Sequence, residues 1–183
     1  MSTPKTQAFP GFDSPGVGFE QPFELLEACH ERVQRSLVLL AKLLDYIDSQ
    51  GHDDTSRTAA INVLRYFDQA APLHHDDEEE HVFPLLLAQA DTQMHSTVHR
   101  LQKDHLQMST LWGSLRVPLL RWSQSAGSGA VDAATRTEAE KFCALYGPHI
   151  EAEENLVYPA SRAQMDADAL ERMGRGMQRR RQA

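Results

Sequence analysis

Two stretches of the chain share one arrangement of residue types that can bind a metal ion. The first, from His74 to Pro84, reads HHDDEEEHVFP, and the second, from His149 to Pro159, reads HIEAEENLVYP. Both have a histidine at the first place, two glutamates at the fifth and sixth, valine at the ninth, an aromatic residue at the tenth and proline at the last. Residues four apart lie on the same face of a helix. The repeat therefore indicates a histidine above a glutamate on two separate helices.

The elements that must position these pairs are four helices. Apolar residues recur at alternating steps of three and four, which is typical of helices packed in a bundle. The pattern predicts helices from about 22 to 51, from a polar turn at 52–58 to Pro84, over 93–124 and over 132–157. Each apolar seam is interrupted by a histidine. The polar residues inside the four seams are His30, His74, Glu78, His105, His149 and Glu153.

The predicted fold is all-α, an up-down-up-down four-helix bundle over residues 20–160. Residues 1–19 are rich in Pro, Gly and Ser and are expected to form an irregular arm. Residues 161–183 end in GRGMQRRRQA and are expected to form a short helix and a solvated basic tail.

A cluster of four imidazoles and two carboxylates in a bundle core indicates metal binding. Each buried polar group without a partner costs about 1–3 kcal/mol, and coordination removes that cost. The set contains no cysteine, so it favours iron or manganese, with zinc and cobalt as alternatives. Two ions are expected, bridged by Glu78 and Glu153, with about two histidines each and open positions for a small ligand. A lone histidine in a seam would more often be a hydrogen-bonded core residue, but four seams share the feature.

Some details of the site depend on helical phase alone. The choices of Glu78 over Glu79 and of Glu153 over Glu154 follow from the seams and can slip by one residue. By the same phase, Asp76, Asp77 and Glu80 are expected to point outward, and His95 and His99 to lie on the surface.

Prolines precede the histidine of both repeats. Pro72 lies two residues before His74, and Pro148 directly before His149. A proline within a helix removes one backbone donor. We expect both prolines to widen the helix beside the metal and to free a backbone carbonyl.

Composition narrows the function classes. The chain has 183 residues, a formal net charge of −8 and 41 % hydrophobic residues, which suits one domain with a substantial core and argues against nucleic-acid binding. Its two cysteines form no CxxC pair. No apolar run has the roughly 20 residues that span a membrane, and the first residues lack the apolar core of a signal peptide. A cytoplasmic protein without membrane contact is expected.

At this point the chain resembles the hemerythrin-like proteins, also called HHE cation-binding domains. The matching stretches are CHERV around His30, HHDDEEEHVFP, KDHLQM around His105, and HIEAEENLVYP. The resemblance covers residues from about 20 to 160. It implies a four-helix bundle with a non-haem, oxo- or hydroxo-bridged di-iron centre. It also implies the ligand histidines His30, His74, His105 and His149 and the bridging carboxylates Glu78 and Glu153.

One position departs from the oxygen-carrying members of this family. They have a further histidine on the third helix, one turn before the residue matching His105, and here that place is Leu101. One ion thus loses a nitrogen ligand, and redox turnover or sensing is favoured over reversible oxygen carriage. Glu27 and Tyr146 are candidates to fill the gap, although supporting a ligand from behind or packing in the core suits them better.

Three functions are compatible with these features. The first is a di-iron module that binds or senses dioxygen, nitric oxide or the state of iron. The second is a small di-iron oxidoreductase acting on peroxide, oxygen or nitric oxide. Because no flavin, haem or iron–sulfur motif is visible, that enzyme would need an external reductant protein. The third is a structural bundle with zinc or a vestigial site. The pattern leaves the oligomeric state open.

Overall fold

The structure is a computed structural model that describes residues 17–124 and 130–182, so most of the predicted N-terminal arm lies outside the described residues. Within the described part every regular element is a helix. The elements are α1 (Pro22–Gln50), α2 (Asp54–Arg65), the π-helical turn η1 (Tyr66–Ala70), α3 (Ala71–His81), α4 (Phe83–Leu87), α5 (Thr92–Gln124), α6 (Ala133–Ala152), the π-helical turn η2 (Glu153–Val157), α7 (Tyr158–Arg162) and α8 (Ala167–Arg180).

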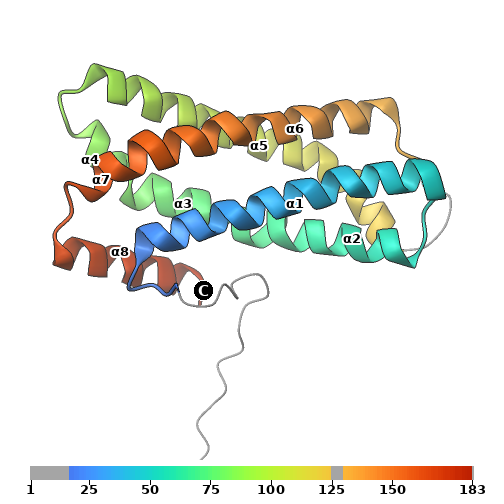
Figure 1. Cartoon of the computed structure of the whole chain (residues 1–183), viewed down its shortest axis with the longest axis horizontal. Helices are drawn as coiled ribbons and strands as arrows, with labels where there is room; N and C mark the ends of the chain where they lie inside the picture. The colour runs from blue at the N-terminus through green and yellow to red at the C-terminus, as the bar shows by residue number, and fades with distance from the viewer. Residues whose placement is uncertain (1–16, 125–129, 183) are drawn as a thin grey trace, which may run out of the picture.

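These elements form four long rods that run up and down beside one another (Figure 1). The rods are α1, then α2 through α4, then α5, and finally α6 through α7. Neighbouring rods contact each other, and the short helix α8 lies against α1 and α3 at one end. The predicted all-α bundle is therefore confirmed.

The two ends of helix α1 are set by a proline and a glycine, and helix α2 begins earlier than predicted. Helix α1 begins with Pro22, which has no N–H to leave unpaired, and ends at Gly51 with a positive φ of 82°. Asp53 accepts a bond from the Ser56 N–H at 2.9 Å, while the Ser56 hydroxyl accepts from the Asp53 N–H. This reciprocal cap starts α2 within the stretch expected to be a turn.

Two of the rods contain a widened turn. At the end of η1 the Ala71 N–H donates to the Tyr66 carbonyl, five residues back, directly before Pro72. The expected widening beside Pro72 is thus present. Around Pro148 helix α6 continues regularly, and the widened turn η2 begins only at Glu153, so the expectation for Pro148 was wrong. In both rods the π turn ends two residues before a proline, Pro72 or Pro159.

Two apolar clusters occupy the core. One holds Val33, Leu40, Leu44, Phe67, Met108, Leu115, Phe142 and Tyr146 with their neighbours. The other holds Phe23, Leu26, Phe83, Leu101, Tyr158, Met173 and Met177 with theirs. The predicted metal ligands belong to neither cluster. Within the described residues, no helix is both long enough and apolar enough to cross a membrane.

The basic C-terminal segment is docked, which corrects the expectation of a solvated tail. Arg181 is buried and its guanidinium donates to the Asp77 carboxylate at 2.7 Å, while Arg180 pairs with Asp77 and Glu80. Asp77 is itself buried, so the expectation that it points outward was also wrong. Two buried charges of opposite sign compensate each other here, which the helical phase of α3 alone did not indicate.

The glycines of α5 and α8 provide a test of this docking. A Cβ at Gly174 would lie 1.9 Å from the Phe19 carbonyl oxygen, whereas a Cβ at Gly113 meets nothing within 4 Å. We expect Gly174→Ala to lower the free energy of unfolding by about 1–3 kcal/mol through overpacking. Gly113→Ala should raise it by about 0.5–1 kcal/mol through helix propensity. Urea titrations of both variants measure the difference, and a stabilised Gly174→Ala protein would contradict the docked position of α8.

Candidate metal centre

The six side chains predicted as ligands meet in the middle of the bundle. His30 comes from α1, His74 and Glu78 from α3, His105 from α5, His149 from α6 and Glu153 from the first position of η2. All six are buried, and Glu78 and Glu153 have no exposed surface at all. The structure therefore brings together every residue that the seams selected.

The two carboxylates face two groups of histidines at once. On one side, His74 Nε2 lies 3.4 Å from Glu78 Oε1 and His30 Nε2 lies 3.2 Å from Glu153 Oε2. On the other side, His105 Nε2 lies 3.4 Å from Glu78 Oε2 and His149 Nε2 lies 2.9 Å from Glu153 Oε1. Each carboxylate thus offers one oxygen to each group, which is the arrangement of two bridging ligands.

The donor atoms fit a pair of ions. His30, His74, Glu78 and Glu153 each offer one ligand atom within 4.8 Å of the others, and so do Glu78, His105, His149 and Glu153. Among the described residues, Glu78 Oε2 and both oxygens of Glu153 are buried without a hydrogen-bond partner. His30 Nε2 and His149 Nε2 are close to the Glu153 carboxylate, but their orientation does not give a hydrogen bond. Such orphaned carboxylate oxygens are costly unless a cation binds them.

The second glutamate of each repeat has a separate task. Glu79 Oε1 lies 3.0 Å from His105 Nδ1, and Glu154 Oε1 lies 2.8 Å from His30 Nδ1. A carboxylate at Nδ1 fixes the ring and directs Nε2 towards the centre. The geometry thus separates the glutamates that the seams left ambiguous, with Glu78 and Glu153 inside and their neighbours behind the histidines.

The aromatic residue of each repeat stacks on the same histidine. Phe83 lies over His105 and Tyr158 over His30, each with ring centroids 5.6 Å apart. Each repeat therefore supplies a glutamate in the centre, an orienting glutamate and a stacking ring, which explains why the whole pattern recurs and not only its histidine and glutamate.

Tyr158 adds a hydroxyl that the equivalent Phe83 lacks. This hydroxyl donates to Glu78 Oε1 and lies 3.2 Å from His30 Nε2. Burial, and then the charge of Glu78, raises the pKa of Tyr158 well above its usual value, so the phenol keeps its proton. The two halves of the centre therefore differ in polarity.

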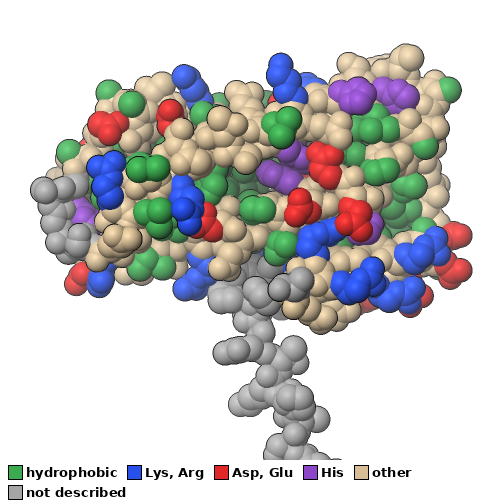
Figure 2. All heavy atoms as spheres, turned by 180° about the vertical axis from the view of Figure 1, so that it is seen from behind, with side chains coloured by type: hydrophobic (Ala, Val, Ile, Leu, Met, Phe, Trp, Pro, Cys, Tyr) green, Lys and Arg blue, Asp and Glu red, His purple; other side chains and the backbone are tan. Residues whose placement is uncertain are grey.

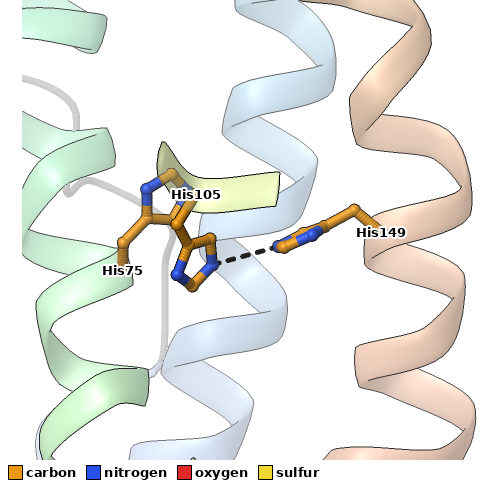
Figure 3. A group of neighbouring side chains, drawn as sticks. All are labelled: His75, His105 and His149. Carbon is orange, nitrogen blue, oxygen red and sulfur yellow. Dashed lines mark hydrogen bonds between the residues drawn. The ribbon is translucent and has the colours of Figure 1, made fainter. Parts of the chain in front are cut away.

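His75 is a further candidate ligand that the sequence analysis did not select. Its ring stacks on that of His105, with centroids 4.0 Å apart, and its donor atom lies within 4.8 Å of those of His105 and His149. Figure 3 shows the three rings converging, with His105 Nε2 and His149 Nε2 3.1 Å apart. Burial, and then the charge of His105, holds the pKa of His75 well below its usual value, which leaves a nitrogen lone pair for a metal.

His75 is the residue placed to supply the ligand missing at Leu101. Leu101 is fully buried in the apolar cluster around Phe23, so α5 supplies no second nitrogen. Glu27 is exposed, and Tyr146 packs against Phe67 and Phe142, so neither candidate fills the gap. The adjacent pair His74-His75 was the available signal.

Two cavities adjoin the centre. A void of about 10 Å³, lined by His30, His74, His75, His149 and five apolar or aromatic neighbours, is the inner void. A much larger cavity of about 620 Å³, the outer cleft, is lined by His75, His105, Glu79 and Phe67 among others. In Figure 2 one face of the molecule is hollowed near its middle, and histidine side chains are visible there. The outer cleft reaches only the half that contains His105.

A helical bundle with paired histidines and carboxylates projecting inward defines a class of two-metal carboxylate proteins. The family model for the hemerythrin HHE cation binding domain matches residues 21–161. The chain is also 35 % identical, over 164 residues, to an uncharacterized protein of Haemophilus influenzae, covering 90 % of this chain and 92 % of that one. The chain belongs to the hemerythrin HHE cation-binding domain family.

Protons are expected to compete with metal ions for this site. Although burial lowers their pKa values, the facing carboxylates, Glu153 first, raise the pKa of His30 to about 9 and that of His105 to about 11. Both imidazoles are therefore protonated at neutral pH when no ion is bound, and metal loading should release about two protons from them. A pH indicator in weak buffer measures the release. Metal affinity should rise with pH up to about a hundredfold per unit, and release of no proton would contradict these pairings.

The role of His75 can be separated from that of the other histidines. We expect His75→Leu to weaken binding of one of two ions at least about tenfold, because one nitrogen donor is lost. His99→Leu is the matched control, since His99 is exposed on α5 and lies outside every donor group. Titration of metal into stripped protein, followed by elemental analysis, measures both variants. Equal occupancy in the two variants would remove His75 from the ligand set.

Proposed function

We propose that this protein holds two iron ions at the centre of its bundle and uses them to bind a small ligand, dioxygen or nitric oxide. The observation that carries the proposal is the pair of fully buried carboxylates, each with one oxygen directed to each histidine group. When bound, iron supplies redox chemistry and open coordination positions. The residues that would hold the two ions are His30, His74, His75, Glu78, His105, His149 and Glu153.

The donor set favours iron over a structural zinc. Imidazole nitrogens and carboxylate oxygens suit iron and manganese, while structural zinc sites are usually rich in thiolates. Cys29 is buried next to His30 in the chain, but it belongs to none of the donor groups found among the described residues. Burial raises the pKa of Cys29 to about 11, which keeps the thiol protonated.

The protein's own groups would prepare the site for a small ligand. Glu79 and Glu154 orient two of the imidazoles, so that little rearrangement is needed when ions bind. Tyr158 holds a proton at its hydroxyl beside Glu78 and His30. The inner void has room for about one water-sized molecule, which matches a diatomic ligand better than a larger one.

Oxidoreductase activity is the second candidate, and the outer cleft favours it. A cavity of about 620 Å³ that ends at His75 and His105 gives a solute larger than a diatomic molecule access to one ion. Turnover of peroxide, dioxygen or nitric oxide would require electrons from an external reductant protein. The ligand-binding function needs no such partner.

Metal content and the visible spectrum of iron-loaded protein test the proposal. We expect about two irons per chain and iron charge-transfer absorption that changes on reduction and on exposure to dioxygen or nitric oxide. Glu78→Gln should lose at least about half of the iron, because a bridging oxygen with its charge is removed. Glu80→Gln is the matched control, since Glu80 is exposed and pairs with Arg180.

Three outcomes separate the alternatives. Stable spectral changes with nitric oxide but no consumption of peroxide or nitric oxide support a binding protein. Steady consumption with an added electron donor supports the oxidoreductase. One zinc per chain, retained in the Glu78→Gln protein, contradicts both and leaves a structural bundle.

A further inference from the structure

The Asp104 side chain of α5 is directed towards the metal centre, although it is not among the candidate ligands. Its Oδ2 accepts a hydrogen bond from His149 Nδ1 at 3.4 Å. Only 16 % of the Asp104 side chain and 2 % of the His149 side chain are exposed. Among the described residues, Asp104 belongs to no group of donor atoms that could hold an ion. Its place behind the histidine therefore calls for an explanation other than coordination.

The ring of His149 has to keep one orientation if its Nε2 is to bind an ion. This nitrogen lies 2.9 Å from Glu153 Oε1 and 3.1 Å from His105 Nε2. Figure 3 shows the ring extending from α6 towards that of His105. Rotating the ring by half a turn about its Cβ–Cγ bond would put a carbon atom in the place of Nε2. An acceptor at Nδ1 prevents this rotation, because it fixes both the ring and its tautomer.

Two other histidines of the centre have a carboxylate in the same place. Glu154 accepts from His30 Nδ1 at 2.8 Å, and Glu79 accepts from His105 Nδ1 at 3.0 Å. Like Asp104, both acidic residues are next in the chain to a candidate ligand and serve a histidine of another rod. Successive residues of a helix differ by about 100° in direction, so a helix that turns one residue to the centre can turn the next towards a neighbouring rod. Asp104 is the third residue placed in this way.

Neither burial nor a surface ion pair accounts for this contact. His74 Nδ1 is buried but has no hydrogen-bond partner among the described residues, so burial alone does not give a histidine of the centre an acceptor. Arg100 donates to the same Asp104 oxygen at 3.2 Å, from four residues away on α5. Pairs on exposed helix faces contribute little to stability. In this pair only Arg100 is largely in solvent, with 46 % of its side chain exposed, whereas the carboxylate is turned inward to the histidine.

We infer that Asp104 is a positioning residue, which holds the His149 ring so that Nε2 is directed to the ion beside His105. Arg100 bonds to the same carboxylate oxygen and limits its movement. The inference deepens the proposed function and rests on it for the presence of the ion. The hydrogen bond itself joins two protein side chains, so it can be measured with the ion removed.

Proton NMR of the full chain, stripped of metal with a chelator, tests the hydrogen bond directly. A buried imidazole N–H with an acceptor exchanges slowly with water, and the signal of His149 is assigned by its absence from a His149→Gln variant. We expect this proton to exchange at least about tenfold faster in Asp104→Leu, which has no acceptor, than in wild type or in Arg100→Leu. Equal exchange in wild type and Asp104→Leu overturns the inference.

Titration of ferrous iron into the stripped proteins, with dioxygen excluded, measures the consequence for the centre. Asp104→Leu should bind one of the two ions at least about tenfold more weakly, and Asp104→Asn, which keeps an acceptor oxygen, should lose less. Arg100→Leu is the matched control, because it breaks the ion pair and leaves the acceptor, and its affinity should stay within about threefold of wild type. Equal losses in Arg100→Leu and Asp104→Leu would assign the effect to the ion pair and overturn the inference.

The two readouts separate this inference from the proposed function. Wild type that takes up no iron contradicts the two-iron centre, and the proton exchange rates then still decide whether Asp104 holds the ring of His149. Wild type that binds two irons, together with an Asp104→Leu protein that binds both as tightly, supports the centre and overturns the positioning role.

Discussion

The structure depends on two carboxylates that are buried without a hydrogen-bonded partner for most of their oxygens. Glu78 and Glu153 have no exposed surface, and their charges repel each other in a medium of low dielectric. Burial, then the charge of Glu153, raises the pKa of Glu78, while the facing imidazoles, His149 first, overcome burial and hold that of Glu153 well below its usual value. Positive charge between them is therefore a condition of the fold, and protons on the histidines supply it when ions do not.

The rest of the bundle arranges that charge through an approximate internal symmetry. Each repeat places one glutamate in the centre, a second glutamate behind a histidine from another rod, and an aromatic ring over that same histidine. The π turns do not follow this symmetry, because η2 begins at Glu153 itself, whereas η1 ends at Ala70, before the first repeat begins. The two halves of the centre differ in three features. His75 and the outer cleft adjoin only the half with His105, and the Tyr158 hydroxyl adjoins only the half with His30. We attribute these differences to function, because packing alone would preserve the symmetry.

The sequence predicted the bundle and the six central residues because both depend on regular helical spacing, which apolar seams report directly. It missed His75 because the seam assigns one inward position to each turn, whereas His75, the next residue after His74 on the regular helix α3, is half-buried and reaches the ring of His105 beside the seam. It misjudged Asp77 for another reason. The partners of Asp77, Arg180 and Arg181, lie about a hundred positions away, and no periodicity within α3 reports such a contact. Residues beside the main seam and ion pairs between distant parts of the chain were thus the features that helical spacing could not predict.

The asymmetry assigns different tasks to the two proposed ions. The ion beside His30 and His74 would lie under the Tyr158 hydroxyl and would adjoin the protein interior and the inner void. The ion beside His105 and His149 would gain His75 and would lie at the end of the outer cleft. Since both would share Glu78 and Glu153, a change in charge at the outer ion would alter the field at the inner one directly.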